Sequence, residues 1–390
     1  MQLDIAILSV LNRIYQPTLL MTSHDRYGRC GLIKQTVDSR IIIDCEAHNR
    51  FLPNEAVSFA VLGKADGEKI DAEDDAITID SDEDSTEYIS TPSEGDAVGA
   101  MPKHRPLTSK ELLIAVPFVR GYALKNKRWF ILFVDQIIPI KFSDNAFQSL
   151  VLPREQKDLI LAFVESQVKH KNDFDDIIEG KGKGMIMLLS GPPGVGKTLT
   201  AESVAENMRV PLYMMSAGDL GLDPAGIEES LNTILDMVAK WNAVLLLDEA
   251  DVFLEARSTS DLERNKMVSI FLRVLEYYEG TLFLTTNRIK NIDDAFHSRI
   301  HISMQYPSLT AASRRHIWST FIGKTTGLSD GQLDALAQVE LNGRQIKNVL
   351  KTAQMLAKRG SGDGVGDGKV NMGHIETILA IERGKDSTMW

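Results

Sequence analysis

The sequence predicts an α/β protein whose central part is a parallel β-sheet with helices on both faces. From about residue 151, short apolar segments alternate with helical stretches, which is typical of such a sheet. A glycine-rich loop follows the first apolar segment, and a tail without strand patterns follows the last. We therefore expect a helical lid at the C-terminal end. Before the sheet we expect a small, mainly β region that an acidic disordered segment interrupts.

These patterns divide the 390 residues into five expected regions. They are an α+β N-terminal region (1–70), an acidic disordered linker (71–103), a β-rich module (104–150), the α/β core (151–307) and the helical lid (308–390). The strands before and after the acidic linker are candidates for one small β module.

Apolar, β-branched runs mark the individual strands. Those of the core are expected at residues 185–189, 211–216, 243–247 and 281–286. Those of the N-terminal part are expected at 40–45, 111–124 and 128–142, with residues 125–127 as a hairpin turn between the last two. Helices are expected at 199–208, 343–359 and 372–383, the last two separated by a glycine-rich loop at 360–368.

The bulk composition narrows the class of protein. A net charge of −11 argues against a basic, nucleic-acid-coating protein. No segment reaches the roughly 18–20 apolar residues of a membrane span, and no basic residue precedes the short apolar start of the chain. The two cysteines, Cys30 and Cys45, suit reduced thiols, although a single bridge between them is also compatible with the sequence. We expect a soluble intracellular protein, cytoplasmic or nuclear.

The acidic tract at residues 71–96 is the most polar part of the chain. It holds eleven Asp and Glu residues, and no Lys or Arg lies between Lys69 and Lys103. Such a segment repels itself and buries too little apolar surface to offset its ordering entropy, so we expect it to be disordered. Residues 77–85 could add a strand to a partner's sheet edge, and Ser81 and Ser85 lie in acidic contexts that suit phosphorylation. A solubilising linker is the interpretation that we favour.

The glycine-rich loop carries the strongest chemical signal. It fits the phosphate-binding pattern G-x-x-x-x-G-K-[ST] in full and opens a predicted helix, so its backbone N–H groups can surround phosphate oxygens. Lys197 would contact the β- and γ-phosphates, and Thr198 would provide a hydroxyl ligand for Mg²⁺. The sequence therefore predicts a P-loop NTPase that binds ATP and Mg²⁺. The expected nucleotide-binding residues are Gly191, Pro192, Pro193, Gly194, Val195, Gly196, Lys197, Thr198 and Leu199.

Two further strands end in polar residues. Asp248 and Glu249 follow the apolar run 243–247. Asp248 would hold Mg²⁺ as the Walker-B carboxylate, and Glu249 would polarise the attacking water. Asn287 ends the next strand and could orient that water or contact the γ-phosphate. A strand that ends in solvated acids, or in a turn asparagine, is the alternative, and the upstream phosphate loop makes it the weaker one.

The order of these motifs, continued through residues 293–301, resembles the AAA group of the AAA+ ATPases. A closer resemblance is to fungal multidomain AAA proteins whose N-terminal region is poorly characterised. The likeness is specific over residues 174–307, fair in the helical tail and weak before residue 107. It implies an AAA ATPase core at 151–307, a helical lid and assembly into rings, commonly hexamers.

The resemblance also assigns roles to individual residues. Asn287 would be the sensor-1 residue, Arg299 the arginine finger that acts on the neighbouring protomer's ATP, and Arg344 a sensor-2 arginine of the lid. Two departures stand out: Arg299 is a single arginine where many members carry two, and residues 221–226 lack the aromatic residue that threading members place in the pore. The second departure puts threading of an unfolded polypeptide in doubt.

The sequence leaves several functions open. We expect an oligomeric ATP hydrolase that remodels an unidentified protein partner. A nucleotide-gated scaffold with little turnover is the rival, and Asp248, Glu249 and Arg299 argue against it. A nucleic-acid-dependent ATPase is less favoured: residues 118–122 and 127–130 mix basic and aromatic side chains, but aromatics on strands are more often core.

Overall fold

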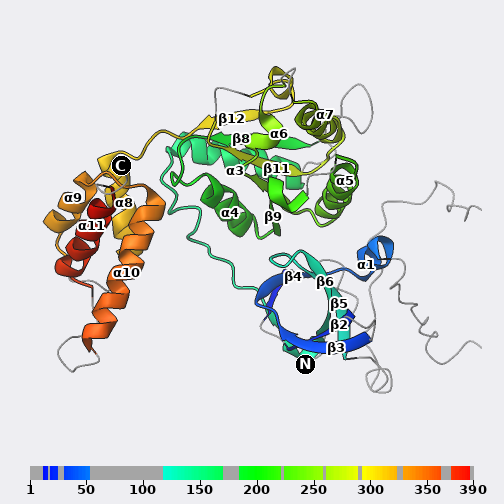
Figure 1. Cartoon of the computed structure of the whole chain (residues 1–390), viewed down its shortest axis with the longest axis horizontal. Coiled ribbons are helices and arrows are strands. Elements are labelled where there is room, and N and C mark those ends of the chain that lie inside the picture. The colour runs from blue at the N-terminus through cyan, green and yellow to red at the C-terminus, as the bar shows by residue number, and fades with distance from the viewer. Residues whose placement is uncertain are drawn as a thin grey trace, which may run out of the picture.

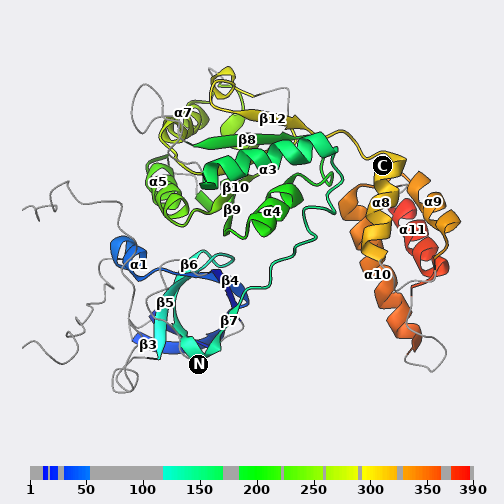
Figure 2. The ribbon, with the colours of Figure 1, turned by 180° about the vertical axis from the view of Figure 1, so that it is seen from behind.

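The computed structural model describes residues 12–15, 18–24, 30–52, 117–169, 184–220, 224–257, 261–288, 292–322, 328–361 and 370–386. They form an N-terminal β barrel, a central α/β core and a C-terminal helical lid (Figure 1). The barrel lies beside the core next to β9, α4 and α5, and the lid lies at another side of the core (Figures 1 and 2).

The core is a five-stranded sheet in which every neighbouring pair of strands is parallel. Its strand order is β12-β8-β11-β10-β9, so β8 and β11 are central and β9 is an edge. The strands are β8 (Met185–Ser190), β9 (Leu212–Ser216), β10 (Val244–Asp248), β11 (Thr281–Thr286) and β12 (Ile302–Gln305). In a sheet of this kind ligands bind beyond the carboxyl ends of the strands.

Helices cover both faces of this sheet, because alternate side chains of each strand point to opposite faces. Residues Met187, Leu246 and Phe283 pack with α3 (Arg154–Lys169) and α4 (Lys197–Met208). Their neighbours along the strands pack with α5 (Pro224–Lys240), α6 (Asp251–Leu254) and α7 (Leu262–Glu276). The predicted α/β class, with helices on both faces of a parallel sheet, is confirmed.

The barrel is a seven-stranded antiparallel sheet that curls into a ring (Figure 1). Its strand order is β3-β2-β6-β5-β4-β1-β7, so strands from before and after the acidic tract are interleaved. They are β1 (Asn12–Tyr15), β2 (Thr18–His24), β3 (Cys30–Thr36), β4 (Ser39–Ile43), β5 (Phe118–Ala123), β6 (Arg128–Phe133) and β7 (Ile137–Pro139). Helix α1 (Cys45–Phe51) follows β4.

The barrel and the core share buried side chains. Tyr122 of β5 packs into the same hydrophobic cluster as Tyr213 of β9 and Trp241, which follows α5. The hydroxyls of Tyr122 and Tyr213 lie 3.1 Å apart, and the indole N–H of Trp241 donates to the Asp44 carboxylate at 3.0 Å. The barrel is therefore packed onto the core by buried contacts as well as joined to it by the chain.

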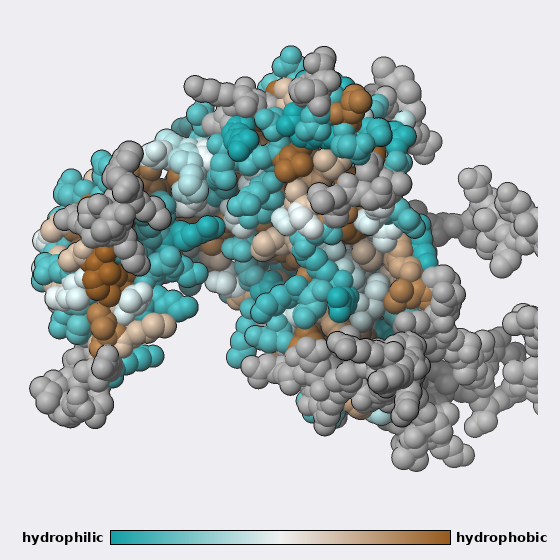
Figure 3. Space-filling view, in the orientation of Figure 1, coloured by the Kyte–Doolittle hydropathy of each residue, from teal (hydrophilic) through white to brown (hydrophobic). Residues whose placement is uncertain are grey.

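The lid is a bundle of four helices with its own apolar centre. They are α8 (Ala311–Ile322), α9 (Asp330–Gln338), α10 (Gly343–Ser361) and α11 (Met372–Asp386). Trp318 and Ile346 are fully buried in this centre. The surface of the molecule is mostly hydrophilic, with a short hydrophobic strip over the lid (Figure 3). Met355 and Ile381 are exposed apolar residues of the lid helices.

Several expected elements differ in extent. The strand expected at residues 40–45 ends at Ile43, because Asp44 accepts a hydrogen bond from Ala47 N at 2.8 Å and so caps α1. The strand expected at 128–142 breaks into β6, a 3₁₀ turn (Val134–Gln136) and β7. The helix expected at 199–208 begins two residues earlier, and β12 has no counterpart among the expected strands.

Some expectations fall outside the described residues. These are the start of the chain, the acidic tract at 71–96, the aromatic-free loop residues 221–223 and most of the glycine-rich loop at 360–368. Cys45 is a free thiol whose pKa burial raises. Within the part of the chain that the structure describes, no helix is both long and apolar enough to cross a membrane.

Candidate nucleotide-binding site

The predicted phosphate loop joins the end of β8 to the start of α4. Gly196 precedes α4 with a φ of 106°, and a Cβ there would meet nothing within 4 Å, so backbone conformation rather than space demands glycine. Gly191 has a φ of 146°, and a Cβ there would lie 2.4 Å from the carbonyl oxygen of Tyr306. The loop therefore closes against the residue that follows β12.

Lys197 is held by three oxygen acceptors. Its ammonium group donates to the carbonyl oxygens of Gly191 and Pro192 and to Oδ1 of Asn287, each at 2.8 Å. Burial lowers the pKa of Lys197, and the nearby Asp248 opposes this effect. Asn287 thus connects the end of β11 to the phosphate loop.

Asp248 lies next to Thr198, as the magnesium hypothesis requires. The hydroxyl of Thr198 donates to the two carboxylate oxygens at 3.0 and 3.2 Å. A hydroxyl and a carboxylate at this separation suit Mg²⁺, which prefers oxygen ligands, so the residues present fit the ion. Among the described residues no cluster of three or more His, Cys, Asp or Glu forms a second candidate metal site.

Thr285 is a site residue whose role the sequence analysis missed. Its hydroxyl accepts from Glu249 N at 2.9 Å and donates to Asp248 Oδ1 at 2.5 Å. The parallel register pairs Leu247 with Leu284, so Thr285 lies beside the carboxylates that end β10. A hydroxyl residue just before the polar strand end was the available signal, but only the strand order shows which carboxylates it meets.

Glu249 has a left-handed backbone with a φ of 53°. This conformation is unfavourable for a residue with a side chain and is often found at functional sites. The residue is exposed, and it borders the same cavity as Lys197 and Asp248. The strain at Glu249 is compatible with a catalytic carboxylate that is held toward a bound ligand.

A cavity of about 410 Å³ unites most of the predicted residues. The lid closes one side, where the N–H of Gly343 donates to the carbonyl of Gly194 at 2.9 Å. Asn342 caps the helix that follows by exchanging two hydrogen bonds of 2.9 Å with Gln345. The predicted residues that border the cavity are Pro193, Gly194, Val195, Gly196, Lys197, Thr198, Leu199, Asp248, Glu249, Asn287 and Arg344.

Other lining residues were not predicted. Residues 149–152 and the α8 side chains of Ile317 and Phe321 make one end of the cavity apolar, which suits a nucleotide base. Lys347, one turn after Arg344 on α10, adds a second lid cation, and Glu202 adds a carboxylate from α4. Burial raises the pKa of Glu202, as does the nearby Asp248. No sequence motif marks these positions, because the fold alone brings them to the cavity.

Arg299 does not border the cavity of its own protomer. Its guanidinium donates to the carbonyl oxygens of Leu272 and Ala295 at 3.1 and 3.0 Å, and to Glu276 at 3.2 Å. The structure therefore places Arg299 beside α7, outside the group of residues around Lys197.

Comparison with known proteins identifies the domain. Residues 187–308 match the family described as "ATPase family associated with various cellular activities (AAA)". A 26S proteasome regulatory subunit 8 homolog of Encephalitozoon cuniculi is 28% identical over 233 residues, 56% of this chain and 59% of that protein. The ATP-dependent zinc metalloprotease FtsH of Lachnoclostridium phytofermentans is 30% identical over 189 residues, 44% of this chain and 32% of the relative.

A third relative is a katanin p60 ATPase-containing protein of Papio anubis, 28% identical over 211 residues. The alignment covers 50% of this chain and 43% of the katanin protein, so the chain spans about half the length of the curated relatives that it matches. The closer resemblance to fungal multidomain AAA proteins is not confirmed by these relatives and stays a prediction. The parallel sheet, the phosphate loop, the Asp248–Glu249 pair and the family match agree, and residues 187–308 are the AAA domain of an AAA+ ATPase.

Proposed function

We propose that this chain binds Mg·ATP, hydrolyses it as a ring-forming oligomer and uses the energy to remodel a protein partner. The observation that carries the proposal is the arrangement around Lys197. An ammonium group, a hydroxyl–carboxylate pair and a strained glutamate border one cavity. Phosphoryl transfer needs such positioned charges more than it needs covalent chemistry.

Each residue has a proposed role. Lys197 and Arg344 contact the phosphates, and Thr198 and Asp248 hold Mg²⁺, which when bound neutralises charge on the β- and γ-phosphates. Glu249 accepts a proton from the attacking water, and Asn287 orients that water while it holds Lys197. Thr285 fixes the carboxylate of Asp248 and the backbone of Glu249.

The oligomer is proposed because Arg299 lies outside its own cavity. A finger that a neighbouring protomer supplies accelerates phosphoryl transfer by about 10³–10⁵. For this role Arg299 would exchange its contacts with Glu276 and with the carbonyls of Leu272 and Ala295 for a phosphate of the neighbour. A hexamer is the expected ring size.

A protein partner is proposed from the relatives. One is named as a regulatory component of the 26S proteasome and another as an ATP-dependent metalloprotease, so two of them are tied by name to protein breakdown. The identity of the partner of this chain stays outside the proposal.

The test is steady-state ATPase activity measured across protein concentrations. Specific activity should rise with concentration, because a neighbour completes each site. Glu249→Gln should bind ATP and lose turnover. Arg299→Ala should also lose turnover, and mixing it with Glu249→Gln protomers should restore part of the activity, because each variant then supplies what the other lacks.

Two outcomes would contradict the proposal. If the wild-type protein binds ATP but shows no turnover at any concentration, a nucleotide-gated scaffold is the better account. If turnover appears only on addition of DNA or RNA, the protein is a nucleic-acid-dependent ATPase. Arg273→Ala is a matched control for Arg299→Ala, because Arg273 also lies on this side of the core but forms an exposed ion pair with Glu228.

A further inference from the structure

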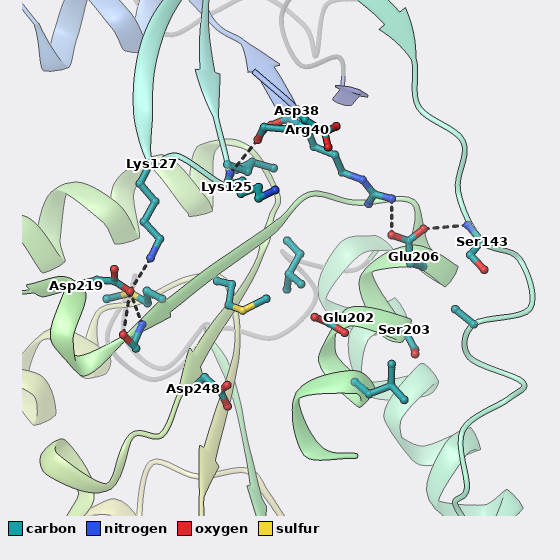
Figure 4. A pocket seen from close by; sticks show the side chains of 18 of the residues that line it. Asp38, Arg40, Lys125, Lys127, Ser143, Glu202, Ser203, Glu206, Asp219 and Asp248 are labelled. Atoms are coloured by element: carbon teal, nitrogen blue, oxygen red, sulfur yellow. Dashed lines mark hydrogen bonds and ion pairs between the residues drawn. The ribbon is translucent and has the colours of Figure 1, made fainter. Parts of the chain in front are cut away.

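A second cavity lies between the barrel and the core (Figure 4). Its volume is about 890 Å³. The loop at residues 38–40 and the hairpin at residues 124–127 border it from the barrel, and α4 and β9 border it from the core. Asp248 lines this cavity as well as the nucleotide cavity, so the proposed magnesium ligand forms part of the wall between the two.

One ion pair spans the cavity toward α4. Arg40 of β4 lies 2.5 Å from the carboxylate of Glu206, with side chains only 23% and 18% exposed. The backbone N–H of Ser143 donates to the other oxygen of this carboxylate at 2.9 Å. The Arg40 guanidinium also lies over the ring of Phe142, 5.1 Å from its centre. The C-terminal end of α4 is therefore held by the barrel and by the segment that leaves it.

A second ion pair spans the cavity toward β9. Lys127, at the end of the barrel hairpin, lies 2.6 Å from the carboxylate of Asp219. This carboxylate also accepts from the backbone N–H and the hydroxyl of Ser216, at 2.7 and 3.1 Å. Burial opposes the shift, but these hydrogen bonds and the charge of Lys127 lower the pKa of Asp219, so it is an anion at neutral pH. In Figure 4 the two pairs lie on opposite sides of the cavity, and Asp248 lies between them.

Both braced elements lead directly to the nucleotide site. Helix α4 begins with Lys197 and Thr198, and a helix of this length transmits a displacement of one end to the other with little deformation. Ser216 of β9 is paired with Asp248 of β10 in the sheet register. The barrel thus holds one element that carries Thr198 and another that flanks Asp248, whose side chains approach within 3.0 Å.

We propose that Arg40 and Lys127 are positioning residues for the nucleotide site: from the barrel, they set the separation of α4 and β9 and thereby that of Thr198 and Asp248. The barrel would then tune magnesium binding without touching either ligand. This inference rests on the proposed ATP and magnesium site, and it deepens that function by giving the barrel a part in it.

The chain contains a matched control. Arg50 and Asp236 also join the α1 region to the core, through an ion pair of 3.3 Å, but their side chains are 64% and 57% exposed. Neither residue borders the cavity. Exposed pairs of this kind contribute little, so Arg50→Met removes a contact between barrel and core without touching the braces.

The experiment measures binding of a fluorescent ADP analogue to the full chain as Mg²⁺ is titrated. Arg40→Met and Lys127→Met should each raise the Mg²⁺ concentration at half-saturation by about tenfold, since residues that orient metal ligands have effects of this size. Nucleotide affinity without Mg²⁺ should change less than threefold, because Lys197 and the phosphate loop are untouched. Arg50→Met should match the wild type in both measurements.

Two reversals separate positioning from general damage. Arg40→Lys should recover part of the lost Mg²⁺ response, and the charge-reversed pair Arg40→Glu with Glu206→Arg should exceed Arg40→Glu alone. The inference is wrong if Arg40→Met and Lys127→Met keep the wild-type Mg²⁺ response, or if Arg50→Met loses it equally. Because the readout is binding, a wild type that binds Mg²⁺ and nucleotide without turnover would refute the proposed hydrolysis and leave this inference standing.

Discussion

At the scale of single residues, the AAA site depends on conformations that most residues avoid. Glu249 has a left-handed backbone, and Thr285 fixes it by accepting its N–H while donating to the carboxylate of Asp248. Such strain persists only where neighbouring contacts over-determine it. The position of the proposed catalytic carboxylate is therefore set by a threonine on the adjacent strand, as well as by its own side chain.

Gly194 is the residue where the phosphate loop meets the lid. Its φ is 76°, and a Cβ there would lie 2.6 Å from the side chain of Asn342. We predict that Gly194→Ala displaces the lid from the loop and weakens nucleotide binding at least tenfold. The left-handed backbone adds a stability cost of about 1–2 kcal/mol. Isothermal titration with an ATP analogue, together with a thermal melt, measures both effects.

Gly331→Ala is the control for this substitution. Gly331 lies in α9 of the lid, and a Cβ there would meet nothing within 4 Å. Alanine favours a helix more than glycine does, so stability should hold or rise by up to about 1 kcal/mol. Unchanged nucleotide affinity in Gly194→Ala would show that contact between loop and lid is unnecessary for binding.

At the scale of elements, the segment that carries Arg299 is fastened through Asp293. This residue is 6% exposed. Its carboxylate accepts from Arg257 Nε at 2.8 Å and from Ala295 N at 3.0 Å, which caps the 3₁₀ turn Asp294–Phe296. Hydrogen bonds from Arg257 lower the pKa of Asp293, more strongly than burial raises it.

The pH dependence of this contact follows from the sign of the shift. Because the pKa of Asp293 is lower in the folded than in the unfolded state, its stabilisation is complete above the unfolded value of about 3.9 and disappears as pH falls through the folded value. We predict that Asp293→Asn destabilises the protein at pH 7 by about 1–3 kcal/mol and that the difference shrinks below about pH 4. Urea unfolding from pH 3 to pH 8 measures it.

The neighbouring Asp294 supplies the comparison, because it is exposed. Asp294→Asn should change stability by less than about 0.5 kcal/mol at each pH. A penalty for Asp293→Asn that is equally large at pH 3 and pH 7 would mean that packing, not the charge of Asp293, stabilises the segment. In that case the ion pair with Arg257 would contribute little.

At the scale of the whole molecule, buried contacts divide the protein unequally. Tyr122 and Ile42 of the barrel share a hydrophobic cluster with Tyr213 and Trp241 of the core, whereas the apolar centre of the lid around Trp318 is separate. A shared cluster makes two parts unfold together, and a separate cluster allows independent unfolding. The barrel is thus energetically part of the core, and the lid is the more independent unit.

This division predicts two thermal transitions in the absence of nucleotide. Trp129 and Trp241 lie 6.2 Å apart at the contact between barrel and core, so they should report one midpoint, and Trp318 should report another for the lid. A nucleotide bound between core and lid, at 100 times its Kd, adds about 2.7 kcal/mol to the closed state and should bring the midpoints together. Tryptophan fluorescence of variants that keep either Trp318 or the Trp129–Trp241 pair separates the signals.

The same experiment checks the energetic role of the barrel. Tyr122→Ala should lower the midpoint of the Trp241 signal and leave that of Trp318 in place, because Tyr122 contacts only the first cluster. Coincident midpoints for Trp318 and Trp241 in the nucleotide-free protein would contradict the division. A barrel transition separate from that of the core would contradict the shared cluster.

The sequence by itself determined the parts of the protein that are encoded locally. A phosphate loop needs glycines, a lysine and a hydroxyl in one short stretch, so residues 191–198 were identifiable from their own pattern. Apolar strands that end in Asp248 and in Asn287 were equally visible, and alternation of strands and helices predicted the parallel sheet that the structure confirms. The barrel was foreseen only as a small β module.

Tertiary structure alone decided which distant residues meet. Thr285 reaches Asp248 because β11 neighbours β10, and the lid reaches Gly194 because α10 begins at the cavity. Arg40 and Lys127 lie far from the AAA domain in sequence, yet they contact Glu206 and Asp219. Local patterns report helix and strand tendencies, whereas these contacts depend on strand order and on packing between parts of the chain, which single-sequence patterns do not encode.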